Sequence, residues 1–194
     1  MQVLQGLFVC YLVGSLPFAY WITRWRTGLD IFEVGEGNMG ARNVWHVVGP
    51  PWGVLTAVLD ALKGVAAVTL ARSWGLDPWL AGLAAVVGHG YPVFHRFRGG
   101  KGLATAFGVA LTLLPWATLA TLATYLLLFL LTRHFHFAIT TALVSLFVVW
   151  LPLSQAPAGT ARRALLLFLW LGAKRLLDHR HMTQVKARDV HWKG

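Results

Sequence analysis

Long apolar stretches separated by short polar ones run along almost the whole chain. They occupy residues 3–23, 52–71, 78–94, 103–114, 116–132, 137–153 and 164–177. Several approach the roughly 20 residues that a helix needs to cross a bilayer, and the shorter third and fourth suggest tilted or partly re-entrant helices around a cavity. The pattern predicts an all-α, polytopic membrane protein with about seven transmembrane helices.

Composition favours the same interpretation. Of the 194 residues, 57% are hydrophobic and only 12% are charged, which is more apolar surface than a soluble domain of this length can bury. The length fits a single integral-membrane domain, residues 1–194. The lone Cys10 excludes a disulfide framework and a cysteine metal cluster. Because no His and carboxylate pair has the spacing of a metal site, we expect neither a metal nor a cofactor.

The formal net charge of +10 comes from Lys and Arg residues in short loops between the apolar stretches. This distribution is typical of cytoplasmic loops, and it argues against a nucleic-acid-binding face. With the N-terminus outside, 13 of the 17 basic residues lie inside and three outside, while Lys63 falls within a span. The C-terminus is then cytoplasmic, and residues 24–51, 95–102 and the C-terminal tail share one face, where their polar side chains can meet.

The segment Gly99-Gly100-Lys101-Gly102 lies between two apolar stretches and has the composition of a phosphate-binding loop. Glycines let backbone N–H groups approach an oxyanion, and a lysine supplies a positive charge. It is not a Walker A loop, because Leu103 stands where Ser or Thr would hold magnesium. Taken alone, a flexible basic turn explains the segment equally well.

A second segment rich in glycine and asparagine, residues 28–44, can fold tightly and supply another wall of an anion site. A purely structural loop is the alternative. On the preceding stretch, Gly14, Ser15 and Pro17 favour a kink and a close helix neighbour over a Ser15 hydroxyl aimed into a site.

Three polar residues fall inside apolar stretches. Asp60 and Lys63 are three residues apart on one helix face, so we expect a structural ion pair that braces the helices rather than direct chemistry. The carboxylate of Asp60 could also orient Lys101. His89, between two glycines, is either a buried hydrogen-bond partner or a proton acceptor.

Four motifs together give the chain a family resemblance: GSLPF at 14–18, GxGNxGAxN at 35–43, LDxxKG at 59–64 and GHxYPVFxxFxGGKGxATxxG at 88–108. In this order they resemble the bacterial acyl-phosphate:glycerol-3-phosphate acyltransferase family, PlsY. The resemblance implies a seven-helix, multi-pass enzyme of the bacterial inner membrane in phospholipid biosynthesis. Such an enzyme moves a fatty acyl group from an acyl phosphate to glycerol 3-phosphate, forming lysophosphatidic acid. Its partners would be these substrates, membrane lipids and an enzyme that forms acyl phosphate.

The resemblance also implies site residues. Lys101, which would hold phosphate and offset charge in the transition state, and His179 are the expected catalytic residues. Arg96 and Arg98 are expected at the edge, against phosphate or lipid headgroups. The general base stays open between His179, His46 and a substrate phosphate. The expected substrate-binding residues are Gly37, Asn38, Arg42, Asn43, His46, Gly99, Gly100 and Gly102.

The chain departs from the family pattern at several of these positions. The family serine of the 35–43 loop is Glu36, its threonine is Arg42, its final arginine is His46, and the asparagine of the tail is Met182. A carboxylate facing a phosphate dianion repels it, and we hypothesise that Arg42 neutralises Glu36 or replaces the arginine. The alternative is a catalytically degenerate paralogue that keeps a phosphate or lipid-phosphate site. A transporter would explain polar residues between helices, but not these motifs.

Overall fold

A computed structural model of the chain describes residues 2–157 and 159–188, apart from the side chains of residues 175 and 178–188. All regular elements in this part of the chain are helical. They divide into two compact units, one of Met1–Val109 with Leu167–Gly194 and the other of Ala110–Leu166. The all-α prediction is therefore confirmed for the described residues.

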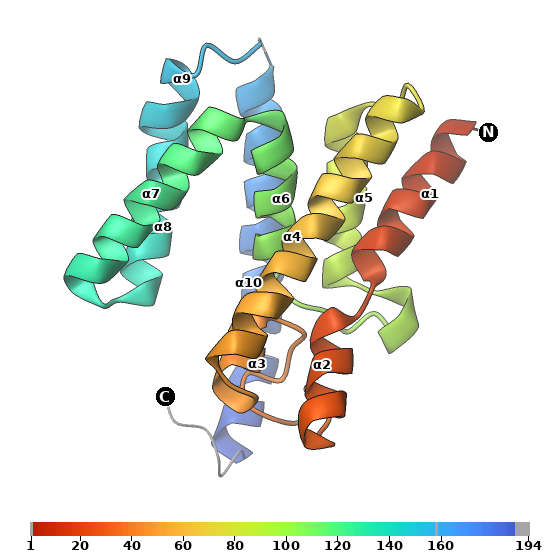
Figure 1. Cartoon of the computed structure of the whole chain (residues 1–194), viewed down its shortest axis with the longest axis vertical. Coiled ribbons are helices and arrows are strands. Elements are labelled where there is room, and N and C mark those ends of the chain that lie inside the picture. Colours follow the sequence, from red (N-terminus) through yellow and green to blue (C-terminus); the bar gives the residue numbers. More distant parts are fainter. Residues whose placement is uncertain (1, 158, 189–194) are drawn as a thin grey trace. The chain divides into compact units, whose positions relative to one another are not determined.

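The first unit contains most of the polar residues singled out above. Helices α1, α4 and α5 pack against one another in it, and α2 and α3 pack on α4 (Figure 1). A connecting segment runs from α5 through the short η1 to α6. The elements of this unit are α1 Gln2–Ser15, α2 Phe18–Thr27, α3 Ala41–Val47, α4 Pro50–Ser73, α5 Pro78–Gly90, η1 Val93–His95, the beginning of α6 Leu103–Leu113 and the later part of α10 Thr160–Arg188.

The first apolar stretch is interrupted where we expected a kink. Helix α1 ends at Ser15 and α2 begins at Phe18, because Pro17 has no N–H to continue the helical hydrogen bonds. The Ser15 hydroxyl donates to the Tyr11 carbonyl at 2.9 Å. A Cβ on Gly14 would lie 2.0 Å from the Ala85 carbonyl oxygen, so this glycine allows α1 and α5 to approach closely.

The second unit consists mainly of a pair of apolar helices. Helix α7, Pro115–Thr132, packs along α8, Phe135–Ser145 (Figure 1). The chain continues through the π-helical turn η2, Leu146–Trp150, into α9, Leu151–Leu153. The Trp150 indole N–H donates to the Thr124 hydroxyl at 3.2 Å and links η2 to α7.

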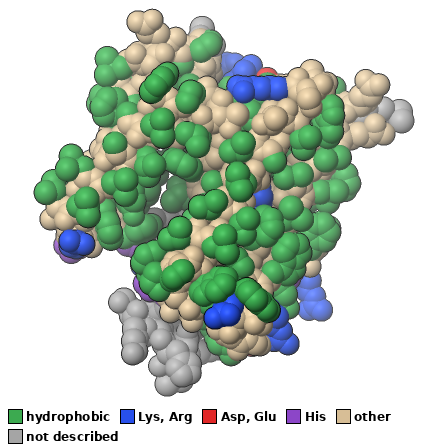
Figure 2. Space-filling model, in the orientation of Figure 1, with side chains coloured by type: hydrophobic (Ala, Val, Ile, Leu, Met, Phe, Trp, Pro, Cys, Tyr) green, Lys and Arg blue, Asp and Glu red, His purple; other side chains and the backbone are tan. Residues whose placement is uncertain are grey.

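Four helical segments of the described chain are long and apolar enough to cross a membrane: Gln2–Thr27, Pro50–Ser73, Pro115–Thr132 and Phe135–Leu153. Helix α6, Leu103–Leu113, is apolar but shorter. Hydrophobic side chains cover much of the face seen in Figure 2, as a surface against lipid requires. These observations fit a multi-pass membrane protein, whereas the count of seven spans and their orientation stay predictions.

Candidate functional site

The loop between α2 and α3 is organised by one buried asparagine. The side-chain carbonyl of Asn43, in the first turn of α3, accepts the Glu36 N–H at 2.7 Å. Its amide donates to the carbonyls of Ile31, Val34 and Asn38 at 3.1, 3.1 and 3.0 Å. Asn43 was expected to bind substrate, yet the contacts described here are all with the backbone. Its observed role is to fix the loop that carries Glu36.

Two glycines let this loop turn tightly around Asn43. Gly35 and Gly37 have φ of +60° and +63°, a region that L-residues with a Cβ rarely adopt. A Cβ on Gly35 would also lie 2.1 Å from the Asn43 side-chain oxygen. Asn38 closes the turn, because its side-chain oxygen accepts the Gly40 N–H at 2.9 Å. The loop backbone is thus held by its own amides, and the Glu36 side chain projects from a fixed position.

The glycine-lysine loop, residues 99–102, lies against the end of α5. It also lies against the Asn43-centred loop, residues 28–40 between α2 and α3. The Gly100 N–H donates to the His89 carbonyl at 3.1 Å. A Cβ added at Gly99 would lie 2.1 Å from the same carbonyl oxygen. A Cβ added at Gly100 would lie 2.3 Å from His89 Nε2 and 2.8 Å from the Met39 carbonyl oxygen. Both glycines are therefore needed for close approach. His89 is buried, and the two loops that we expected to share a face do meet.

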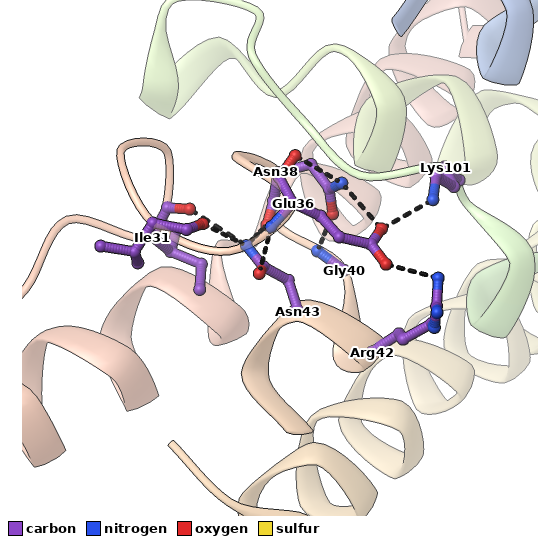
Figure 3. A network of polar contacts seen from close by, with 8 residues as sticks. Ile31, Glu36, Asn38, Gly40, Arg42, Asn43 and Lys101 are labelled. Carbon is purple, nitrogen blue, oxygen red and sulfur yellow. Dashed lines mark hydrogen bonds and ion pairs between the residues drawn. The ribbon is translucent and has the colours of Figure 1, made fainter. Parts of the chain in front are cut away.

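Glu36 joins the two loops through a bridge of charges (Figure 3). Its Oε1 lies 2.6 Å from an Arg42 guanidinium nitrogen, and its Oε2 lies 2.8 Å from Lys101 Nζ. The Asn38 amide also donates to Oε2 at 3.3 Å. The Arg42–Glu36 pair that we hypothesised is thus present. The pairing of Lys101, 65 residues away, with the same carboxylate was not predicted.

Two opposing effects act on the pKa of Glu36. Burial raises it, but the charges and hydrogen bonds of Lys101, together with Arg42 and Asn38, outweigh burial and hold the pKa below its ordinary value. The carboxylate is therefore ionised at neutral pH. The bridge carries two positive charges and one negative charge, so it remains cationic and suited to an anion.

The remaining predicted residues include exposed side chains and one side chain that the structure does not describe. His46 is exposed on α3, and Arg98 is exposed with its guanidinium 4.7 Å from the centre of the Phe32 ring. Helix α10 includes position 179, but the His179 side chain lies outside the described residues. Within the described part of the chain, no group of three or more His, Cys, Asp or Glu residues could hold a metal ion.

A second buried polar group braces the helices beneath the glycine-lysine loop. Lys63 Nζ lies 2.7 Å from Asp60 Oδ1, and His89 Nδ1 lies 3.6 Å from the same oxygen, beyond hydrogen-bond distance. The Lys63 ammonium also donates to the Leu16 carbonyl, at the break between α1 and α2. Lys101 pairs with Glu36 rather than with Asp60. The buried pair thus connects α4 to the α1–α2 break, close to α5.

A membrane protein that gathers a glycine-rich loop and two cations from separate segments has the architecture of a membrane enzyme acting on a phosphorylated substrate. The family model described as glycerol-3-phosphate acyltransferase matches residues 4–187. The chain belongs to this family, which makes it a membrane-bound acyltransferase of lipid biosynthesis. The family resemblance inferred from the motifs is confirmed.

Individual relatives agree over nearly the full length. A glycerol-3-phosphate acyltransferase of Desulforudis audaxviator is 40% identical over 182 residues, which cover 93% of this chain and 89% of the relative. That of Aquifex aeolicus is 38% identical over 189 residues, covering 95% and 94%. The crystal structure of PlsY, an integral membrane glycerol 3-phosphate acyltransferase, in its glycerol 3-phosphate form matches with a TM-score of 0.79. It shares 33% identity and covers 100% of this chain and 96% of that one.

The close approach at Gly100 gives a testable expectation. Gly100→Ala places a Cβ against His89 Nε2 and the Met39 carbonyl, so the loop that carries Lys101 must shift. Overpacking of this kind costs about 1–3 kcal/mol, and we expect roughly a tenfold loss in kcat/KM. Gly172→Ala on α10 is the control, because nothing lies within 4 Å of its added Cβ. Equal activities of the two variants, measured as lysophosphatidate formation, would contradict the expectation.

Proposed function

We propose that this protein transfers a fatty acyl group from an acyl phosphate to glycerol 3-phosphate, giving lysophosphatidic acid and inorganic phosphate. The observation that carries the proposal is the convergence of Arg42, from the start of α3, and Lys101, from the segment before α6, at one partly exposed point beside a glycine-rich backbone. Both substrates carry phosphate, and guanidinium, ammonium and backbone N–H groups are the donors that phosphate binds. The glycerol 3-phosphate form of a solved relative supports the acceptor.

The reaction needs little covalent chemistry from the protein. A hydroxyl oxygen of glycerol 3-phosphate attacks the acyl carbonyl carbon, the carbon–oxygen bond to phosphate breaks, and inorganic phosphate leaves. Since phosphate is a good leaving group, no Ser or Cys nucleophile is required. Lys101 offsets the negative charge that develops on the acyl phosphate. The hydroxyl proton passes to a base, for which His46, His179 and a substrate phosphate are the candidates.

The proposed setting is the bacterial inner membrane, with seven spans, the N-terminus outside and the C-terminus in the cytoplasm. The exposed end of α2 supports a membrane-surface position for the site loops. Trp21 and Trp25 are exposed there, and the Arg26 guanidinium lies 5.3 Å and 4.6 Å from the ring centres of Trp25 and Trp52. Tryptophan and arginine gather where a membrane meets water, and arginine is most abundant on the cytoplasmic side. The acyl chain would lie among the helices, and an enzyme that forms acyl phosphate would supply the donor.

The state of Glu36 favours an active enzyme over a degenerate paralogue. A lone carboxylate in the phosphate site would repel the substrate. Here two cations neutralise it, and the group as a whole keeps a net positive charge. The site therefore retains the electrostatic sign that a phosphorylated substrate requires.

The test is acyl transfer by the purified protein. With palmitoyl phosphate and labelled glycerol 3-phosphate, we expect labelled lysophosphatidate, and we expect none when palmitoyl-CoA replaces the acyl phosphate. Transfer from palmitoyl-CoA alone would overturn the proposed donor. Folded protein that binds glycerol 3-phosphate but makes no product from either donor would establish the degenerate alternative.

A further inference from the structure

The Glu36 carboxylate lies behind the two cations that it joins. Its side chain is 2% exposed, whereas those of Lys101 and Arg42 are 27% and 31% exposed. A phosphate that arrives from solvent therefore meets the cations first. Glu36 is therefore placed to hold them from the buried side.

The two cations reach this carboxylate from unrelated parts of the chain. Arg42 lies in the first turn of α3, and Lys101 lies in the segment before α6 (Figure 3). Each pairs with a different oxygen of Glu36, so one carboxylate sets both positions. Long Arg and Lys side chains have much rotational freedom, and binding an anion to both costs less when both are already held.

Glu36 is itself fixed by the loop that carries it. The Asn43 side chain accepts its N–H at 2.7 Å, and the Asn38 amide donates to its carboxylate at 3.3 Å. The rigid end of the bridge is therefore the buried carboxylate, and the adjustable ends are the two cations.

We propose that Glu36 is a positioning residue that clamps Arg42 and Lys101 into one anion-binding pair and sets the net charge of that pair. The role rests on the proposed function, in which both cations hold substrate phosphate. It makes the site less positive than two unbridged cations, so ground-state affinity for phosphate is lower. In return, both cations are in place when charge develops during acyl transfer.

The same geometry argues against two other roles. A general base needs an oxygen within hydrogen-bond reach of the substrate hydroxyl. Both oxygens of Glu36 face protein cations, and the side chain is buried. An inhibitory carboxylate that mimics substrate would have to occupy the ligand's place in front of the cations, whereas Glu36 lies behind them.

The test compares Glu36→Gln with Glu33→Gln in steady-state kinetics at varied glycerol 3-phosphate. Glu33 is exposed in the same loop, so its variant removes one negative charge without touching the bridge. For Glu36→Gln we expect KM to fall severalfold, because the site gains positive charge, and kcat to fall about tenfold, because the cations lose their common anchor. For Glu33→Gln we expect both constants to stay near those of the wild type.

Three results would overturn the proposal. Identical kinetics of the two variants would show that the bridge has no role in the reaction. A lower KM with unchanged or higher kcat would establish an inhibitory carboxylate. Loss of kcat together with loss of the acidic limb of the kcat–pH profile would establish a general base.

Glu36→Asp distinguishes the effect of the negative charge from the effect of side-chain length. It also provides the test if Glu36→Gln does not fold. It keeps the negative charge but is one methylene shorter, so we expect KM near the wild-type value with kcat still reduced. Full wild-type kcat would overturn the clamp.

The Kd for glycerol 3-phosphate distinguishes a failure of the clamp from a failure of the proposed function. We expect the effects of Arg42→Ala and Lys101→Ala on its Kd to be non-additive in the wild-type background and additive in the Glu36→Gln background. Additive effects in both backgrounds would overturn the clamp alone. No effect of either alanine substitution on Kd would overturn the proposed phosphate site instead.

Discussion

Lys101→Ala is expected to lower kcat/KM for acyl transfer by about 100- to 1000-fold, the usual cost of removing one group that stabilises transition-state charge. Lys101 is the cation of the glycine-rich loop, and its ammonium lies 2.8 Å from Glu36. The substitution removes a contact to phosphate and also leaves the buried Glu36 carboxylate with Arg42 as its one charged partner described here. Both changes make the site more negative just where an anion must bind.

Two variants define how much of this loss comes from charge alone. Lys101→Arg keeps the charge but places a wider, planar group between Gly100 and Gly102, so we expect partial activity. Arg98→Ala removes the same charge from an exposed position in the same segment, and we expect less than a tenfold loss. The measurement is lysophosphatidate formation from palmitoyl phosphate. If Lys101→Ala kept more than a tenth of wild-type kcat/KM, the proposed role of the lysine would be wrong.

Helix positions followed from the sequence because they depend on local pattern. Apolar stretches of suitable length predicted the helices, and Pro17 and Pro115 coincide with breaks between them. The close contact between α1 and α5 was foreshadowed by Gly14, a residue without a Cβ in an apolar stretch. These features need only the chemistry of neighbouring residues.

The arrangement of the site could not be predicted from local sequence pattern, because it depends on contacts between residues far apart in the chain. A carboxylate at position 36 was expected to repel phosphate unless Arg42 neutralised it. Arg42, six residues away, could be suggested as one partner from the loop sequence. The pairing with Lys101 spans 65 residues and arises only when the glycine-lysine loop packs on the end of α5. That Asn43 binds substrate stays a prediction, and the three backbone contacts of its buried amide were not predicted.

Asp60→Asn is expected to lower the free energy of unfolding by about 3–5 kcal/mol, because it leaves the buried ammonium of Lys63 without its carboxylate. Asp60 is 1% exposed and Lys63 is 4% exposed, so water cannot replace the lost charge. Lys63 also donates to the Leu16 carbonyl and lies 5.0 Å from the centre of the Phe18 ring, on either side of Pro17. The substitution therefore disturbs the α1–α2 break as well as α4. Thermal unfolding in one detergent measures the loss.

A second substitution distinguishes an unpaired charge from a simple loss of packing. Adding Lys63→Met to Asp60→Asn removes the stranded ammonium while keeping a long side chain, so the double variant should be more stable than Asp60→Asn alone. Recovery will be incomplete, because the Leu16 carbonyl loses its donor. If the two substitutions destabilise additively, the ion pair is not what holds these helices together.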